Sequence, residues 1–273
     1  MNNEKRFEKI TQDIKSVKIQ GARNIARAAF EAYSLIPSEK SKKILLSLRP
    51  TEPMLEKVLF LVGKKSSKEI LNHFDSAQNQ INKNVLKIIE HKDRIFTYCH
   101  STNVINALIF AKKSWREFEV YNTETRPLFQ GRRTAKELRD AGIKVTMFVD
   151  SASAIAIEKE NKKDKIFADK IFLGADALLS DGIINKVGSG MISELAFNHK
   201  IPVYIIADSW KFSKKKVPIE NRKLNEIWNR APKNIQIKNP AFEFVPKKYI
   251  KGIVTEFGLM KYDDFVKKMR KEN

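Results

Sequence analysis

The spacing of hydrophobic residues changes about one third of the way along the chain. Up to residue 92, apolar side chains recur at the three- and four-residue intervals of amphipathic helices. Two helices are predicted before Pro37, separated by a turn at 19–24. Another is predicted over 53–62, where a proline occupies the first turn, and a long one over 67–90. This part of the sequence predicts a helical amino-terminal domain, residues 1–92.

From Arg94 onward, short apolar segments with strand character alternate with helical segments. Strands are predicted over 95–98, 119–123, 145–149, 171–173, 203–206, 235–237 and 253–255. Such alternation is typical of a doubly wound, mostly parallel sheet covered by helices on both faces. The sequence therefore predicts an α/β protein in which residues 93–273 form a Rossmann-like domain. The last residues are expected to fray.

The single cysteine, Cys99, lies where the first predicted strand ends and a helix begins, at about residue 102. Ligands of open α/β sheets bind at the carboxyl ends of strands, and a helix amino terminus favours a thiolate. Cys99 is therefore a candidate catalytic residue, although an inert cysteine filling the strand-to-helix turn explains the same position. The neighbouring His100 is expected to point to the opposite side, which argues against a Cys–His pair.

Asp176 follows the predicted strand 171–173 and precedes another apolar segment. A carboxylate in such surroundings is desolvated, so its pKa should rise to values useful for proton transfer. A helix cap or a turn is the alternative role. Nearby, Asp181 and Gly182 are better explained as a hairpin turn.

The segment 185–190 is rich in glycine and leads into a helix. Its backbone amides, together with Lys186, are a candidate phosphate site, and a simple connector is the alternative. The segment matches neither the Walker loop nor the dinucleotide-binding fingerprint. From the helical part, Arg49 and the turn at Gly21 are further candidate phosphate contacts, although arginine is also common on surfaces.

The composition bears on the kind of binding partner and on the cellular location. The 52 Lys and Arg residues against 32 Asp and Glu residues give a net charge of +20, which favours a polyanionic partner or a phosphorylated substrate. The lysines are scattered and no RNA-binding signature is found, so a solvated basic surface is the simpler explanation. One cysteine allows no intramolecular disulfide and suggests a cytoplasmic protein. No metal-ligand spacing, leader or membrane segment is recognised.

Several short motifs occur in an order that resembles a known superfamily. They are IQGA (19–22), RPT (49–51), CHS (99–101), TETRP (123–127), QG (130–131), VDSA (149–152), GAD (174–176), NKVG (185–188) and NPAF (239–242). The chain resembles, from about residue 15 to about residue 260, the superfamily of translation initiation factor 2B regulatory subunits, ribose-1,5-bisphosphate isomerases and methylthioribose-1-phosphate isomerases. Its closest resemblance is to the archaeal ribose-1,5-bisphosphate isomerases.

This resemblance implies roles for individual residues. Cys99 and Asp176 match the catalytic pair, and Asn185 and Lys186 match contacts near the sugar. Groups around the phosphates are matched by Gly21, Ala22, Arg49, Arg126, Gln130, Gly131 and Lys211. Gln20 stands where these isomerases carry an arginine, and Arg23 is the residue that could reach the same anion.

The resemblance also implies an activity. It indicates conversion of ribose 1,5-bisphosphate to ribulose 1,5-bisphosphate in nucleotide salvage, with no organic cofactor or catalytic metal. The expected partners are a phosphorylated sugar, a nucleotide such as AMP as effector, and further copies of the chain in a dimer or hexamer. The alternative is a non-catalytic initiation factor 2B-like regulatory subunit that binds the alpha subunit of initiation factor 2.

Overall fold

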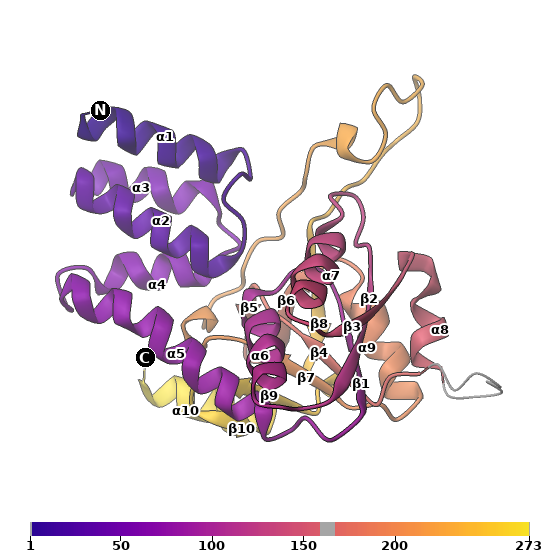
Figure 1. Ribbon diagram of the computed structural model, residues 1–273. Coiled ribbons are helices and arrows are strands. Elements are labelled where there is room, and N and C mark those ends of the chain that lie inside the picture. Colours follow the sequence, from indigo (N-terminus) through magenta and orange to yellow (C-terminus); the bar gives the residue numbers. More distant parts are fainter. Residues whose placement is uncertain (1, 159–166, 273) are drawn as a thin grey trace.

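The computed structural model describes residues 2–158 and 167–272 (Figure 1). Its amino-terminal part is helical, and its larger part is built on a mostly parallel seven-stranded sheet. The predicted fold class is therefore confirmed. No helix in these two stretches combines the length and apolar character needed to cross a membrane.

Five helices form the amino-terminal part: α1 (Asn3–Lys15), α2 (Ala22–Leu35), α3 (Glu39–Leu48), α4 (Pro53–Leu61) and α5 (Ser67–Leu86). The first four enclose a core that includes Ile14, Ile25 and Leu45. The sequence analysis missed α3, because Leu45 is the one large apolar residue that this lysine-rich helix buries fully. Its start is nevertheless clear, since the Ser38 side chain accepts a hydrogen bond from the Ser41 amide.

Helix α5 belongs to two cores at once. Ile70 and Phe74, in its first half, pack with α4, whereas Ile81 and Val85 pack against α6 (Thr102–Lys113) and the sheet. In Figure 1 this helix runs from the stacked helices into the sheet region. Helix α5 thus connects the helical part to the sheet, and the boundary between residues 92 and 93 stays a prediction.

The large sheet has the strand order β10-β9-β7-β4-β1-β2-β3, with only β10 antiparallel to its neighbour. Helices α5, α6 and α7 (Gln130–Asp140) cover one face, and α8 (Ser153–Ile157), α9 (Ser189–Asn198) and α10 (Tyr262–Glu272) cover the other. The strands are β1 (Asp93–Thr97), β2 (Phe118–Thr123), β3 (Lys144–Phe148), β4 (Lys170–Leu173), β7 (Val203–Ile206), β9 (Gly252–Thr255) and β10 (Gly258–Met260).

A small antiparallel sheet follows β4. It contains β5 (Ala177–Leu178), β6 (Gly182–Lys186) and β8 (Phe242–Pro246), and the turn at Asp181 and Gly182 joins the first two as predicted. The predicted strand 235–237 is wrong, because it falls in a segment, residues 213–240, that offers it no sheet partner. This segment projects from the body in Figure 1 and is called the arm below. The expected fraying is not found up to Glu272, because residues 262–272 form α10, and residue 273 lies outside the described residues.

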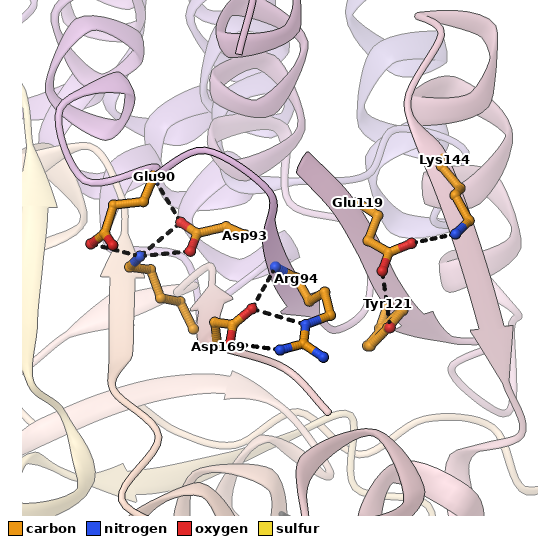
Figure 2. Close-up of polar contacts among 8 residues, drawn as sticks. Glu90, Asp93, Arg94, Glu119, Tyr121, Lys144 and Asp169 are labelled. Atoms are coloured by element: carbon orange, nitrogen blue, oxygen red, sulfur yellow. Dashed lines mark hydrogen bonds and ion pairs between the residues drawn. The ribbon is translucent and has the colours of Figure 1, made fainter. Parts of the chain in front are cut away.

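Charged side chains tie together the amino ends of the central strands (Figure 2). The Lys170 ammonium of β4 donates hydrogen bonds to both carboxylate oxygens of Asp93 in β1, at 2.7 and 2.9 Å, and to Glu90 at 3.1 Å. Arg94 forms a two-pronged pair with Asp169. This charged edge lies at the end of the sheet opposite to the strand termini that carry Cys99 and Asp176.

Candidate active site

A pocket of about 1000 Å³, its open mouth included, lies at the carboxyl ends of β1 and β4. The amino ends of α2 and α6 border it, and the arm contributes Glu220, Arg222 and Glu226. Ten of the predicted site residues line it, namely Gly21, Ala22, Arg23, Arg49, Cys99, Gln130, Asp176, Asn185, Lys186 and Lys211. The structure thus brings Cys99 and Asp176 into one cavity.

Cys99 is held by its backbone at the end of β1. Its N–H donates to the hydroxyl of Thr125 at 3.1 Å, and its carbonyl accepts a hydrogen bond from the Thr134 hydroxyl at 2.7 Å. Its φ of +63° is unusual for a residue with a side chain and marks a sharp change of direction. These contacts fix the thiol at the strand-to-helix turn, where it remains partly exposed to the pocket.

The expectation that the helix terminus would favour a thiolate is wrong. Burial raises the pKa of the Cys99 thiol to about 12, and the nearby Lys186 ammonium and the His100 backbone only partly oppose this effect. The His100 ring, as predicted, does not pair with the thiol. It contacts the Thr134 hydroxyl at 3.2 Å, and burial together with Arg133 lowers its pKa to about 4.

Asp176 stands between β4 and β5. Its backbone N–H donates to the carbonyl of Ile184 at 2.8 Å. Burial raises the pKa of its carboxyl group, against the opposing charges of Lys211 and Arg49, so the predicted direction is confirmed. Within the described stretches no hydrogen bond or ion pair reaches the carboxylate. The carboxyl group therefore faces the pocket without a partner in the protein.

Lys186 is the cation best placed for an anionic ligand. It is buried at the pocket wall, burial lowers its pKa, and no described side chain or carbonyl accepts a hydrogen bond from its ammonium. The neighbouring amides do not form the expected phosphate site, because the Gly188 and Gly190 N–H groups both donate to one oxygen of Glu243, at 2.7 and 2.6 Å. The Glu243 carboxylate of β8 therefore occupies the position that a bound phosphate would need.

The other predicted contacts near Lys186 have partners within the protein. Asn185 donates through its amide nitrogen to the Ser189 hydroxyl at 2.9 Å. Lys211 donates to the carbonyl of Ala175 at 2.7 Å and to the side chain of Asn103 at 3.2 Å. Both residues line the pocket. The Lys211 hydrogen bonds hold the loop after β4 and the start of α6, whereas the Asn185 hydrogen bond joins β6 to the start of α9.

The predicted arginines of the helical part are engaged by carboxylates. Arg23 pairs with Asp75 of α5 at 2.5 Å. Arg49 lies 2.9 Å from Glu220 of the arm and 3.8 Å from Glu52. Gly21, with φ +84°, is the N-cap of α2, and both Gly21 and Ala22 line the pocket.

Two predicted residues do not line the pocket. Arg126 is exposed, and its guanidinium lies over the ring of Phe129. Gly131 is a packing residue, because a β-carbon there would come within 1.7 Å of the Thr123 carbonyl oxygen. Its neighbour Gln130 does line the pocket, with a buried side-chain oxygen that has no described hydrogen-bond partner.

Sequence reasoning missed the acidic lining of the pocket. Glu52 directly follows the motif 49–51, so its position was visible, but nothing in its spacing marked it as a site residue. Glu220 and Arg222 lie in the arm, which has no periodic pattern. Arg222 contacts Glu220 at 3.3 Å and also pairs with Glu226.

Outside this pocket, His73, Asp208 and Glu256 have ligand-type atoms within 4.8 Å of one another. All of them already have partners: His73 lies 3.0 Å from Asp208, which also accepts from the Trp210 amide, and both Glu256 oxygens accept from Ser209. We therefore assign this group a structural role that ties α5 to the loops after β7 and β9.

The fold and pocket define a class of α/β proteins in which a helical part closes a site over the strand ends. Residues 15–262 match the model of the initiation factor 2 subunit family, and the chain belongs to that family. In Methanocaldococcus jannaschii, a relative named ribose 1,5-bisphosphate isomerase is 34% identical over 91% of this chain and 89% of its own length. The relative of that name in Pyrococcus furiosus is 33% identical over 92% and 89%.

Solved structures agree on the fold. A Pyrococcus horikoshii protein described as translation initiation factor eIF-2B superposes with a TM-score of 0.80 at 24% identity, covering 94% of this chain and 97% of that one.

A Pyrococcus furiosus relative, a putative translation initiation factor eIF-2B subunit 2-like protein, is 26% identical over 92% of this chain and 95% of its own. The relatives named isomerases are more similar to this chain than the translation-factor relative is, which supports an isomerase activity.

Proposed function

We propose that the chain is a sugar-phosphate isomerase that converts ribose 1,5-bisphosphate to ribulose 1,5-bisphosphate in nucleotide salvage, acting as a homo-oligomer. The observation that carries this proposal is the shared pocket of Cys99, Asp176 and Lys186. A thiol, a carboxyl group of raised pKa and an unpaired ammonium are the groups that proton transfer on an anionic sugar requires. The isomerase relatives support the same reading.

The reaction moves one hydrogen from C2 to C1, opens the ring and leaves a carbonyl at C2. Asp176, whose pKa is raised by burial, supplies a proton to the ring oxygen as the C1–O bond breaks. Cys99 acts as the thiolate: it takes the proton from C2 as the C1=C2 enol forms and returns it to C1 as the enol becomes the ketone. Because burial disfavours its thiolate, the Lys186 ammonium stabilises that form during the transfer. The C2 hydroxyl proton passes to the Asp176 carboxylate as the carbonyl forms, which restores the acid for the next turnover.

The test is turnover of ribose 1,5-bisphosphate by the purified protein and by Cys99→Ser and Asp176→Asn. We expect both variants to fold and to lose about 10²- to 10⁴-fold in kcat, the usual contribution of a general acid or base. Asp181→Asn, in the exposed hairpin turn, is the matched control and keeps full activity. Unchanged kcat in both pocket variants would overturn the assignment.

A second candidate is a regulatory subunit that binds the alpha subunit of initiation factor 2. It is favoured by the similarity to the putative translation factor subunit of Pyrococcus furiosus, which covers 95% of that relative. Its signature would be no turnover by the unaltered chain together with tight binding of initiation factor 2. The same purified protein serves for both measurements.

A further inference from the structure

Unpartnered polar atoms gather in the pocket. Six buried side-chain nitrogens or oxygens in the described stretches have no hydrogen-bond partner, and four of them belong to pocket residues: Arg49 Nε, Glu52 Oε2, Gln130 Oε1 and Glu220 Oε2. Arg49 Nε and Glu220 Oε2 lie 2.9 Å apart as an ion pair, which leaves Glu52 Oε2 and Gln130 Oε1 without any polar partner. Proteins rarely leave such atoms unpaired. Their concentration here indicates that a ligand completes them.

Glu52 is the most deeply buried of these residues, with only 3% of its surface exposed. It is placed at the amino end of α4, yet its side chain makes no capping hydrogen bond there. It is also a weak partner for Arg49, because Glu220 lies closer to that guanidinium, at 2.9 Å against 3.8 Å. Neither the helix nor the arginine therefore accounts for a carboxyl group at this position.

The charged groups that face Glu52 come from every element around it. Asp176, after β4, and Glu220, from the arm, disfavour its ionisation, whereas Arg49 and Lys211 favour it. Burial has the largest effect, and together these influences raise the pKa of Glu52 to about 8. At neutral pH the group carries a proton, so it can both donate and accept a hydrogen bond.

The unpaired atoms form a set that suits hydroxyl groups better than a phosphate. Gln130 Oε1 is an acceptor, and the protonated Glu52 carboxyl group can be a donor or an acceptor. Each hydroxyl of a sugar can donate to one such atom and accept from another. A phosphate next to Glu220 would instead meet a carboxylate of like charge.

We propose that the Glu52 carboxyl group hydrogen-bonds a hydroxyl of the sugar beside Asp176 and is thus a further substrate-binding residue. The inference rests on the proposed function for the identity of the sugar. It deepens that function, because it assigns the hydroxyl-bearing middle of the substrate to the cluster of Glu52, Arg49 and Glu220. The phosphates are left to Lys186 and the helix amino ends.

The first test needs no substrate. The pKa of Glu52 is higher in the folded chain than its ordinary value of 4.5, so folding takes up a proton between about pH 4.5 and pH 8. The unaltered chain therefore loses stability relative to Glu52→Gln as pH rises through this window. We expect melting temperatures that coincide near pH 5 and diverge up to about pH 8, with the variant higher. A difference independent of pH would overturn the protonated carboxyl group.

The second test is the pH profile of kcat/KM with ribose 1,5-bisphosphate. Activity of the unaltered chain should fall as pH rises above about 8, when Glu52 ionises, and Glu52→Gln should lack this fall because its amide stays neutral. Glu52→Ala should lose about 10- to 100-fold at all pH values, as expected for a hydrogen bond lost in a buried site. Equal activity of Glu52→Ala and the unaltered chain would overturn the inference while leaving the proposed function intact.

If the unaltered chain shows no turnover, a binding measurement separates a failure of this inference from a failure of the proposed function. Calorimetry with ribose 5-phosphate and 2-deoxyribose 5-phosphate compares ligands that differ by one hydroxyl. The inference predicts that the unaltered chain prefers the ribose compound and that Glu52→Ala loses this preference. No preference in the unaltered chain, or no binding of either sugar, would overturn it.

Discussion

Thr125 determines where Cys99 sits, since its hydroxyl accepts the Cys99 N–H at 3.1 Å. Thr125 is itself placed by Asp150, which accepts its backbone N–H at 2.8 Å and also accepts from Thr123 and Arg126. One carboxylate at the end of β3 therefore organises the loop after β2, and this loop holds the end of β1. The position of the thiol depends on three neighbouring strands.

Asp150→Ala should accordingly disturb the site without touching the ligand. Three hydrogen bonds to a charged acceptor are lost, so we expect unfolding to cost about 2–4 kcal/mol less and kcat to fall about tenfold. Denaturant unfolding and turnover measure the two effects. Asp140→Ala, an exposed position on α7, should change neither. A stable Asp150→Ala variant with full turnover would show that the loop after β2 keeps its conformation without the Asp150 carboxylate.

The Cys99 thiol should react slowly with iodoacetamide at neutral pH. Alkylation follows the thiolate fraction, and the pKa is raised to about 12, so the rate should still be climbing about tenfold per pH unit above pH 9. An ordinary thiol levels off there. Lys186→Met removes the favourable charge and should slow the reaction further. The unfolded chain is the reference, and a plateau near pH 9 in the folded protein would contradict the expectation.

Glu220 competes with anionic ligands for two guanidinium groups, Arg49 at 2.9 Å and Arg222 at 3.3 Å. Glu220→Gln should remove one carboxylate partner from each, leaving Arg49 with Glu52 at 3.8 Å and Arg222 with Glu226. The binding of inorganic phosphate should tighten about five- to tenfold, most clearly at low salt. Glu226→Gln, which removes a carboxylate partner from Arg222 alone, should have a smaller effect. Titration calorimetry decides the matter: weaker phosphate binding by Glu220→Gln would mean that the carboxylate orients the arginines instead of blocking them.

The charged edge in Figure 2 should govern stability alone. Asp93→Asn leaves the buried Lys170 with the exposed Glu90 as its remaining carboxylate, which should cost about 3 kcal/mol of folding free energy. Lys144→Met breaks an exposed pair with Glu119 and should cost less than about 1 kcal/mol. Turnover per folded molecule should be normal in both. Loss of turnover without loss of stability in Asp93→Asn would link this edge to the site.

The alternation of strands and helices was enough to predict the sheet and to place Cys99 and Asp176 together, because both follow strands that neighbour each other. What the pattern could not supply was the contribution of the arm. Glu220 is 44 residues beyond Asp176 and belongs to no regular element, so only the folded chain brings it to Arg49. The prediction that the helix terminus would favour the Cys99 thiolate was wrong for a related reason, since the burial of Cys99 depends on the whole pocket. Glu243 likewise reaches Gly188 only through the pairing of β6 and β8.

The charged edge and the pocket lie at opposite ends of the sheet, so substitutions at one end need not affect the other. Substitutions at the pocket rim can alter which sugar is accepted while the Lys170 ion cluster keeps the strands in register. Such a separation allows ligand preference to drift among descendants of one ancestor without each change having to be repaired elsewhere. A scaffold of this kind is a natural starting point for directed evolution toward other phosphorylated ligands.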